Sequence, residues 1–141
     1  MFGSSQFNIE GGTFLNKNEV AFIDYKHFNG NQTAIANPSR YRTSFLRLPY
    51  YDFSTTNSYL EGHYQHHFEG FFLDRLPLFR KLGFKTVVGA KALLTSGQNY
   101  FELHAGLDNI GINIIRLFRV DAVASIQNGD LGWGVVVGIG F

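Results

Sequence analysis

The sequence has no cysteine, few prolines and a net charge close to zero. It contains no cysteine and only three prolines among 141 residues, and its formal charges sum to +1. The lack of cysteine excludes disulfides, thiolate metal ligands and a cysteine nucleophile. The small net charge, with lysines and arginines scattered rather than clustered, argues against nucleic-acid binding.

Long hydrophobic runs are missing as well. A membrane-spanning helix needs about 18 to 20 mostly apolar residues in succession, and no window of the chain approaches this. The sequence, with a mean hydropathy of −0.06, therefore excludes a helical membrane protein. It leaves a membrane β-barrel open, because strands that alternate apolar and polar residues average to neutral hydropathy. The length suits a single domain, residues 1–141, and no shift in composition suggests a second.

Aromatic residues and glycines, in contrast, are abundant. The chain has 15 Phe, 7 Tyr, 1 Trp and 16 Gly, a composition that favours strands, turns and membrane-interface girdles over helices. In Leu131–Phe141 every second residue is large and apolar, and the residues between them are glycines apart from Val136. Glycines leave room for long side chains from neighbouring strands. The stretch is therefore predicted to be the last strand of a narrow transmembrane barrel.

The same alternation predicts eight strands in all. They are Gln6–Leu15, Glu19–Asn29, Thr43–Phe53, Ser58–Phe72, Phe84–Leu94, Tyr100–Asp108, Ile114–Gln127 and Leu131–Phe141. Polar turns are expected at Asn16–Asn18, Thr95–Asn99 and Gln127–Asp130, and a loop at Gly30–Arg42. Pro49 weakens the third strand, because proline cannot donate to a strand ladder. The predicted fold is all-β: an antiparallel transmembrane β-barrel of about eight strands, or the last eight strands of a larger barrel.

One strand carries a continuous line of polar residues on a single face. They are Glu61, His63, Gln65, His67 and Glu69. No soluble core would accept five such residues in succession, so they are predicted to line the barrel interior. Charges of both signs are expected to share that interior and neutralise each other: Glu10, Asp24, Lys26, Glu61, Lys85, Lys91, Glu102, Arg119 and Asp121. Two aromatic girdles are expected, with Tyr50, Tyr100 and Trp133 at one rim and Phe72, Phe84 and Phe141 at the other.

The histidines and carboxylates on the polar face are candidates for metal binding or acid–base catalysis. His63 and His67 lie on one strand face about 7 Å apart, and a zinc site would need a further ligand such as His104. An inward line of hydrogen-bonded side chains is the preferred interpretation. Glu102 and Asp108 could serve acid–base chemistry, but nothing marks a nucleophile or cleft, so charges that fill the lumen are preferred. We therefore predict no catalytic, cofactor-binding or metal-binding residues and no enzymatic activity.

Four runs of residues suggest a family. They are Phe22–Asn31, Leu76–Leu82, Gly106–Gly111 and Arg119–Asp121. The chain resembles the C-terminal β-barrel of an outer-membrane protein family of unknown function from Bacteroidota. Members commonly carry a carboxypeptidase-regulatory-like domain before the barrel. They are much longer than this chain, so the resemblance implies that it corresponds to their last strands.

These patterns lead to an expected function. The chain is expected to be a non-enzymatic integral β-barrel protein of the bacterial outer membrane, structural or a subunit of an outer-membrane complex. Its expected partners are outer-membrane lipid, other outer-membrane subunits and the barrel assembly machinery, whose recognition signal the terminal Ile139 and Phe141 resemble. Two alternatives stay open: a wall segment of a larger transport barrel, and a soluble ligand-binding barrel of lipocalin type, which would need its apolar face inside.

Overall fold

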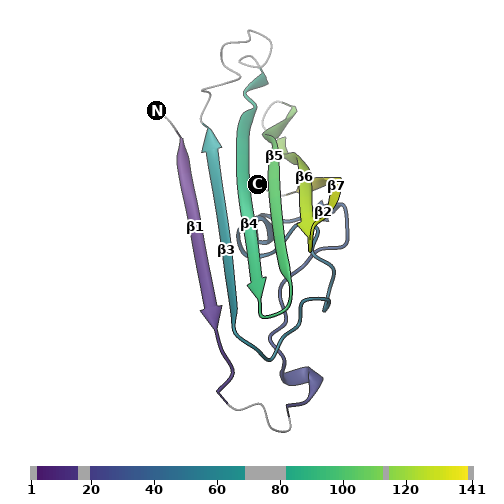
Figure 1. Ribbon diagram of the computed structural model, residues 1–141. Helices are drawn as coiled ribbons and strands as arrows, with labels where there is room; N and C mark the ends of the chain where they lie inside the picture. The colour runs from purple at the N-terminus through teal and green to yellow at the C-terminus, as the bar shows by residue number, and fades with distance from the viewer. Residues whose placement is uncertain (1–2, 16–19, 69–81, 113–114, 140–141) are drawn as a thin grey trace.

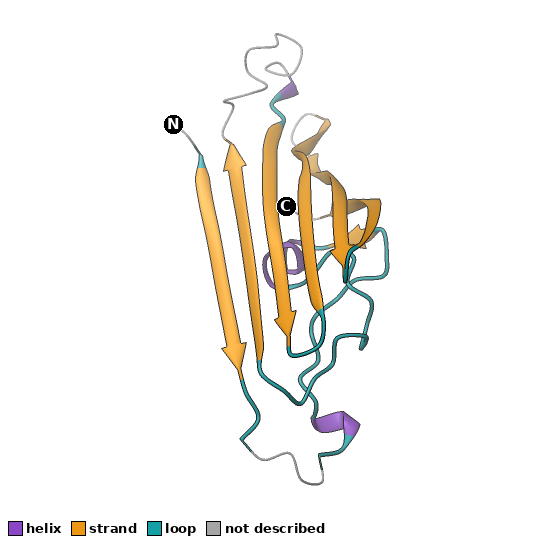
Figure 2. Cartoon of the chain, viewed as in Figure 1, coloured by secondary structure: helices purple, strands orange, loops and turns teal. Residues whose placement is uncertain are grey.

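The computed structural model describes residues 3–15, 20–68, 82–112 and 115–139 (Figure 1). The elements are β1 (Ser4–Gly12), η1 (Phe22–Asp24), β2 (Ile35–Ala36), α1 (Pro38–Thr43), β3 (Tyr59–Phe68), β4 (Lys85–Thr95), β5 (Asn99–Ile112), β6 (Ile115–Gln127) and β7 (Asp130–Ile139). The named elements are thus strands apart from one short α-helix and one 3₁₀ turn, and Figure 2 shows that strands dominate. No helix in the described residues is long and apolar enough to cross a membrane.

The strands form one curled sheet in the order β1-β3-β4-β5-β6-β7-β2. Neighbours from β1 through β7 are antiparallel, but β2 pairs with β7 in parallel through Ile35 and Ala36. Within the described ranges the sheet does not close on itself. The prediction of a closed, purely antiparallel barrel of about eight strands is therefore wrong for this part of the chain, which forms an open, mixed sheet of seven strands.

Six of the eight predicted strands are confirmed as the six long strands of the sheet. Their turns follow the predicted chemistry. Between β6 and β7, Asn128 and Gly129 adopt φ angles of 50° and 100°, the left-handed pair that a two-residue hairpin turn requires. The predicted turn at Asn16–Asn18 lies outside the described residues.

The two remaining predicted strands, Glu19–Asn29 and Thr43–Phe53, are wrong. A strand with one buried face alternates its exposure. Phe45 and Leu46 are adjacent yet both fully buried, whereas Phe22 and Ile23 are adjacent and both exposed. Pro49 further prevents a regular ladder. The predicted loop Gly30–Arg42 is irregular apart from β2 and the first five residues of α1.

The segment between β1 and β3 instead packs across the concave face of the sheet. Phe28, Phe45, Leu48 and Phe53 cluster with Leu93 and Tyr100 of the sheet. A second cluster joins Ala36, Tyr41 and Leu46 to Val123 and Val136. This segment, residues 28–55, fills the hollow that a closed barrel would enclose, and we call it the inner segment.

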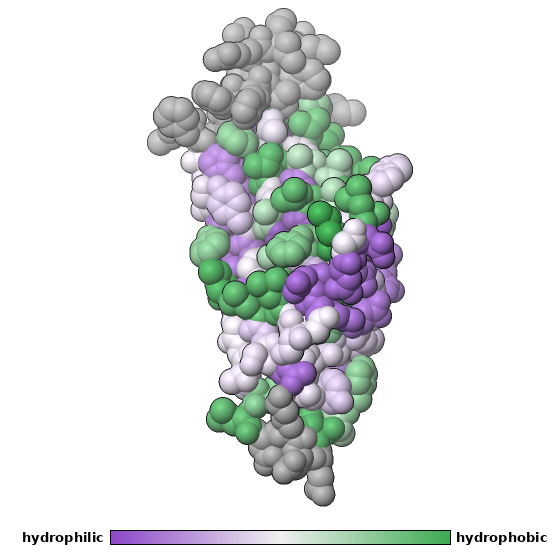
Figure 3. Space-filling view, viewed as in Figure 1, coloured by the Kyte–Doolittle hydropathy of each residue, from purple (hydrophilic) through white to green (hydrophobic). Residues whose placement is uncertain are grey.

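Outward-facing residues of the sheet are apolar and exposed. Trp133 and Leu103 are 79% and 61% exposed, and Phe101, Val135 and Ile126 are each more than 40% exposed. Figure 3 shows hydrophobic residues over much of the visible face, beside a hydrophilic patch on its right side. The predicted polarity, apolar outward and polar inward, is confirmed for β3 to β6, whereas on β1 residues of both faces are exposed.

Two glycines give inward side chains the room predicted for them. A Cβ atom at Gly134 would lie 2.1 Å from Nη1 of Arg47, and one at Gly89 would lie 2.2 Å from Nε2 of His104. One member of the predicted girdles is misplaced. Trp133 and Tyr50 are exposed, but Tyr100 is buried against the inner segment, so its placement at a rim is wrong. Phe72 and Phe141 lie outside the described residues.

Candidate functional site

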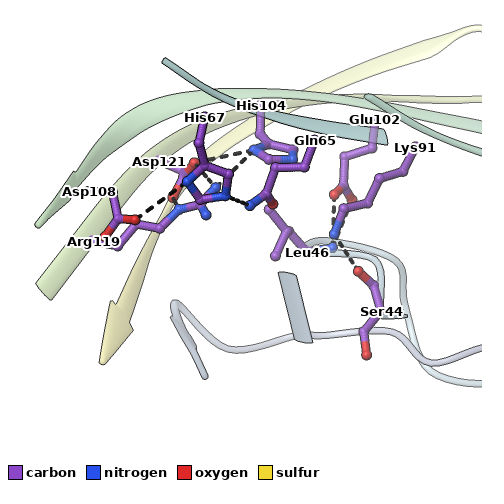
Figure 4. Close-up of polar contacts among 10 residues, drawn as sticks. All are labelled: Ser44, Leu46, Gln65, His67, Lys91, Glu102, His104, Asp108, Arg119 and Asp121. Atoms are coloured by element: carbon purple, nitrogen blue, oxygen red, sulfur yellow. Dashed lines mark hydrogen bonds and ion pairs between the residues drawn. The ribbon is translucent and has the colours of Figure 1, made fainter. Parts of the chain in front are cut away.

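Polar side chains from four strands meet on the concave face. They are Glu61, His63 and Gln65 of β3, Lys91 of β4, Glu102, His104 and Asp108 of β5, and Arg119, Asp121 and Ser125 of β6, all buried. The predicted inward line is confirmed for its first three members, and His67 is partly buried beside them; Glu69 lies outside the described residues. Figure 4 shows how these groups hold the inner segment against the sheet.

Glu102 binds the backbone of the inner segment. Its carboxylate accepts hydrogen bonds from the N–H of Leu46 at 2.9 and 3.0 Å and from the N–H of Arg47 at 3.0 Å (Figure 4). The hydroxyl of Tyr100 donates to the same carboxylate at 2.9 Å. Hydrogen bonds to a charged acceptor are stronger than neutral ones. Glu102 therefore anchors the loop that follows α1.

Lys91 adds a second anchor of opposite charge. It lies directly across from Glu102 in the pairing of β4 with β5, and its Nζ donates to the backbone carbonyl oxygen of Ser44. The two charges thus bind donors and acceptors of one short loop, residues 44–47. This arrangement satisfies backbone groups that would otherwise be buried without partners.

Arg119 and Asp121 form a fully buried ion pair. The guanidinium donates to both carboxylate oxygens, at 2.7 and 2.8 Å, and neither side chain is exposed. The Nδ1 atom of His104 lies 3.2 Å from the same carboxylate. On its other side, Arg119 stacks 3.9 Å from the ring centre of Tyr41, a cation–π contact. Burial and the carboxylate of Asp121 raise the pKa of Tyr41, so its hydroxyl stays protonated.

His63, His67 and His104 do not converge on one point. His63 bonds Glu61 at 2.6 Å, His67 faces Asp108 at 3.7 Å, and His104 pairs with Asp121 as above. In the part of the chain that the structure describes, no three His, Asp or Glu side chains are placed to hold a metal ion. Each histidine instead has its own carboxylate.

Glu102 and Asp108 also have separate contacts. Glu102 holds the inner segment, whereas Asp108 faces His67 and accepts a hydrogen bond from the N–H of Asn109 at 2.6 Å. These contacts make the two carboxylates positioning groups for the chain itself. The buried polar side chains of β3 to β6 can bind polar groups, because they hold hydrogen-bond donors and acceptors in fixed positions.

Four of the predicted interior charges lie elsewhere. Asp24 and Lys85 are exposed, and Glu10 pairs with Lys26 away from the buried cluster. Burial would lower the pKa of Lys26, but hydrogen bonds to Glu10 and Tyr59 outweigh it and hold that pKa above its usual value. Of the nine charges predicted to share the interior, five on β3 to β6 are buried there. Together with buried Asp108 they make four acidic and two basic groups, so the predicted neutralisation is incomplete.

Sequence reasoning missed the partners on the inner segment. Tyr41, Ser44, Leu46 and Arg47 were assigned to a loop and an uncertain strand, yet they contact Arg119, Lys91 and Glu102. One signal was present, because Phe45 and Leu46 are successive large apolar residues followed closely by a proline. That pattern is typical of a buried, non-strand segment.

Comparison with known proteins gives one match. A model for the C-terminal domain of a family of unknown function, DUF5686, matches residues 1–107. This agrees with the resemblance at its coarser level, a C-terminal domain without known function. The match includes the runs at Phe22–Asn31 and Leu76–Leu82 and ends within Gly106–Gly111. No curated protein and no solved structure matches the chain.

Proposed function

The chain belongs to the DUF5686 family, because the model of that family's C-terminal domain matches residues 1–107. The family has no known function, so we propose one from the geometry of the sheet. The chain is a non-enzymatic integral β-barrel protein of the bacterial outer membrane, structural or a subunit of an outer-membrane complex. Its partners are outer-membrane lipid, further outer-membrane strands or subunits, and the barrel assembly machinery during insertion.

The inverted polarity of the sheet carries this proposal. Soluble proteins bury apolar side chains and almost never bury Lys, Glu, Arg or Asp completely. Here Arg119, Asp121 and Glu102 are at most 1% exposed, while Trp133 is 79% exposed. Lipid is the solvent that favours this arrangement, since membrane barrels carry apolar residues outside and polar residues inside.

The open edges favour one form of the proposal, a wall segment of a larger barrel. Among the described strands, β1 has β3 as its one neighbour, and the outer edge of β7 pairs with β2 only at Val137 and Gly138. Unpaired backbone groups do not occur against hydrocarbon. Each open edge can therefore take a further antiparallel strand. In a wider barrel the inner segment, which covers the polar face, would lie inside the lumen, and transport would be a function of the complete wall.

The lipocalin-type alternative has no comparable support. It needs the apolar face inside and the polar line outside. Leu103 and Val135 are exposed, whereas Glu61 and His63 are 7% and 4% exposed. The observed exposures run opposite to those a soluble ligand-binding barrel requires.

The single tryptophan provides the test. Trp133 is the one Trp in the sequence, so its fluorescence reports directly on the outward face. We expect strong quenching when the chain is reconstituted in vesicles of brominated phospholipid. A matched variant, Trp133→Phe with Phe45→Trp, moves the reporter to a fully buried position in the inner segment, and its quenching should be weak.

Two results would contradict the proposal. One is equal quenching of the two reporters, since that would mean that the outward face contacts lipid no more than the buried interior does. The other is a folded chain that stays in aqueous buffer without detergent and does not associate with the vesicles.

A further inference from the structure

The side chain of Arg47 carries a positive charge that pairs with no carboxylate among the described residues. Glu102 is close, but its carboxylate accepts from the backbone N–H groups of Leu46 and Arg47 and from the hydroxyl of Tyr100. The guanidinium itself is half-buried, with Nε enclosed and Nη1 and Nη2 still accessible. A charge that is partly removed from water is costly unless it is paired. Arg47 is therefore available to an anionic group from outside the described chain.

A pocket of about 240 Å³ lies beside this guanidinium, between residues 31–34 and the outer edge of β7. Gly134 of β7 makes room for the arginine, because a Cβ atom there would lie 2.1 Å from Nη1 of Arg47. Among the described residues that line the pocket, Arg47 is the one charged side chain. The volume is below the range of about 300 to 1,000 Å³ that is typical of drug-sized ligands, so it suits a small molecule or a single side chain.

The wall opposite β7 is held in a fixed shape. The side-chain oxygen of Asn31 accepts hydrogen bonds from the backbone N–H and the hydroxyl of Thr33, at 3.1 and 2.8 Å. Its amide nitrogen donates to the carbonyl oxygen of Ile35 at 3.3 Å, and Asn31 is 1% exposed. The pocket is thus formed before any ligand arrives, which reduces the entropy lost on binding.

The edge of β7 adds a second donor to the pocket. The backbone N–H of Val137 points outward from the sheet and donates to the carbonyl oxygen of Ala34. Backbone groups of alternate residues on an antiparallel strand point in the same direction, so the N–H of Val135 also points to this edge. Val135 lines the pocket, and none of the described strands pairs with this edge at Val135.

These two groups define the class of ligand. Both are hydrogen-bond donors and one is charged, so the pocket requires an anionic acceptor. A carboxylate carries a single negative charge and accepts two parallel hydrogen bonds from a guanidinium, whereas a phosphate dianion would leave one charge without a partner here. We propose that this pocket binds a carboxylate group through the guanidinium of Arg47 and the N–H of Val135. The inference goes beyond the proposed function and holds whether or not the outward face contacts lipid.

The carboxylate can come from a small molecule or from an acidic side chain on a strand that adds to the edge of β7. Titration of the ¹⁵N-labelled 141-residue chain in non-ionic detergent with N-acetylglycine tests the first source. We expect a saturable shift of the Val135 amide signal, and no saturable shift with the uncharged N-acetylglycinamide. An end-blocked peptide, Thr-Val-Glu-Val-Thr, tests the second source. Binding at least tenfold tighter than that of N-acetylglycine, and lost in the Gln counterpart of the peptide, assigns the carboxylate to a strand; otherwise it belongs to a small molecule.

Two arginine variants separate the site from bulk charge. Arg47→Met should weaken carboxylate binding at least tenfold, because it removes the charged donor. Arg42→Met is the matched control: it removes the same charge from an exposed position on α1, outside the lining of the pocket, and should bind as the unmodified chain does. Circular dichroism shows whether each variant is folded. If Arg47→Met does not fold, the Val135 shift in the unmodified chain still decides.

Four results would overturn the proposal. They are the absence of saturable binding for both carboxylate probes, binding that leaves the Val135 signal unchanged, tighter binding of inorganic phosphate than of either carboxylate, and equal carboxylate affinity in folded Arg47→Met and Arg42→Met. The last result would mean that the carboxylate responds to net charge and not to this pocket.

Discussion

Replacing Glu102 by alanine should release the inner segment from the sheet. The carboxylate accepts hydrogen bonds from the backbone N–H groups of Leu46 and Arg47 and from the hydroxyl of Tyr100. A hydrogen bond to a charged group contributes about 1.5 to 3 kcal/mol. Losing the two backbone bonds at the lower figure gives about 3 kcal/mol of local stability. Because about 1.4 kcal/mol corresponds to a factor of ten, the opening equilibrium should rise roughly a hundredfold.

Amide hydrogen exchange measures this opening directly. In Glu102→Ala, the N–H groups of Leu46 and Arg47 should exchange about a hundredfold faster, while amides at the centre of β6 keep their protection. Glu61→Gln is the matched control, because Glu61 is equally inward but bonds His63 rather than the inner segment. Equal protection of Leu46 in Glu102→Ala and in the original chain would refute the assigned anchoring role.

Three further substitutions test the inward cluster, the close packing and the outward face. Arg119→Met leaves Asp121 buried without its ion-pair partner and should lower the free energy of unfolding by about 3 to 5 kcal/mol. Urea denaturation measures this loss, and the double variant Arg119→Met with Asp121→Asn should recover part of it. Gly89→Ala places a Cβ 2.7 Å from a backbone oxygen of β3 and should cost about 1 to 3 kcal/mol; Gly62→Ala, which meets nothing within 4 Å, should leave the unfolding midpoint unchanged. Leu103→Arg should destabilise the chain in lipid vesicles by about 2 to 4 kcal/mol for a position near the bilayer midplane. On a water-exposed surface the effect would be below about 0.5 kcal/mol, and such a small effect would contradict the proposed membrane contact.

Much of the sheet could be predicted because its information is local. Strand β6 alternates buried Arg119, Asp121 and Val123 with exposed Val120 and Ala122, and a period of two is visible without knowledge of any partner strand. Hairpin turns are local in the same sense, since the Asn-Gly pair after β6 selects its own backbone conformation. The inward placement of polar side chains followed from that period once the apolar face was taken to be outside.

The site was less predictable, because its contacts join residues far apart in the chain. Glu102 contacts Leu46 and Arg47, which precede it by more than fifty positions, and no local period encodes that pairing. The histidines show the same limit. Their shared strand face was correctly predicted, but only the structure shows that each has a separate carboxylate partner.

The sequence alone determined which face of each long strand is apolar and where the hairpins after β4 and β6 turn, because these features depend on alternation and on turn residues a few positions apart. Only the tertiary structure decided that residues 28–55 fill the concave face instead of adding strands, and that the sheet stays open at β1. Burial of adjacent Phe45 and Leu46 needs a surface to pack against, and the curved sheet provides it only after β3 to β7 have come together.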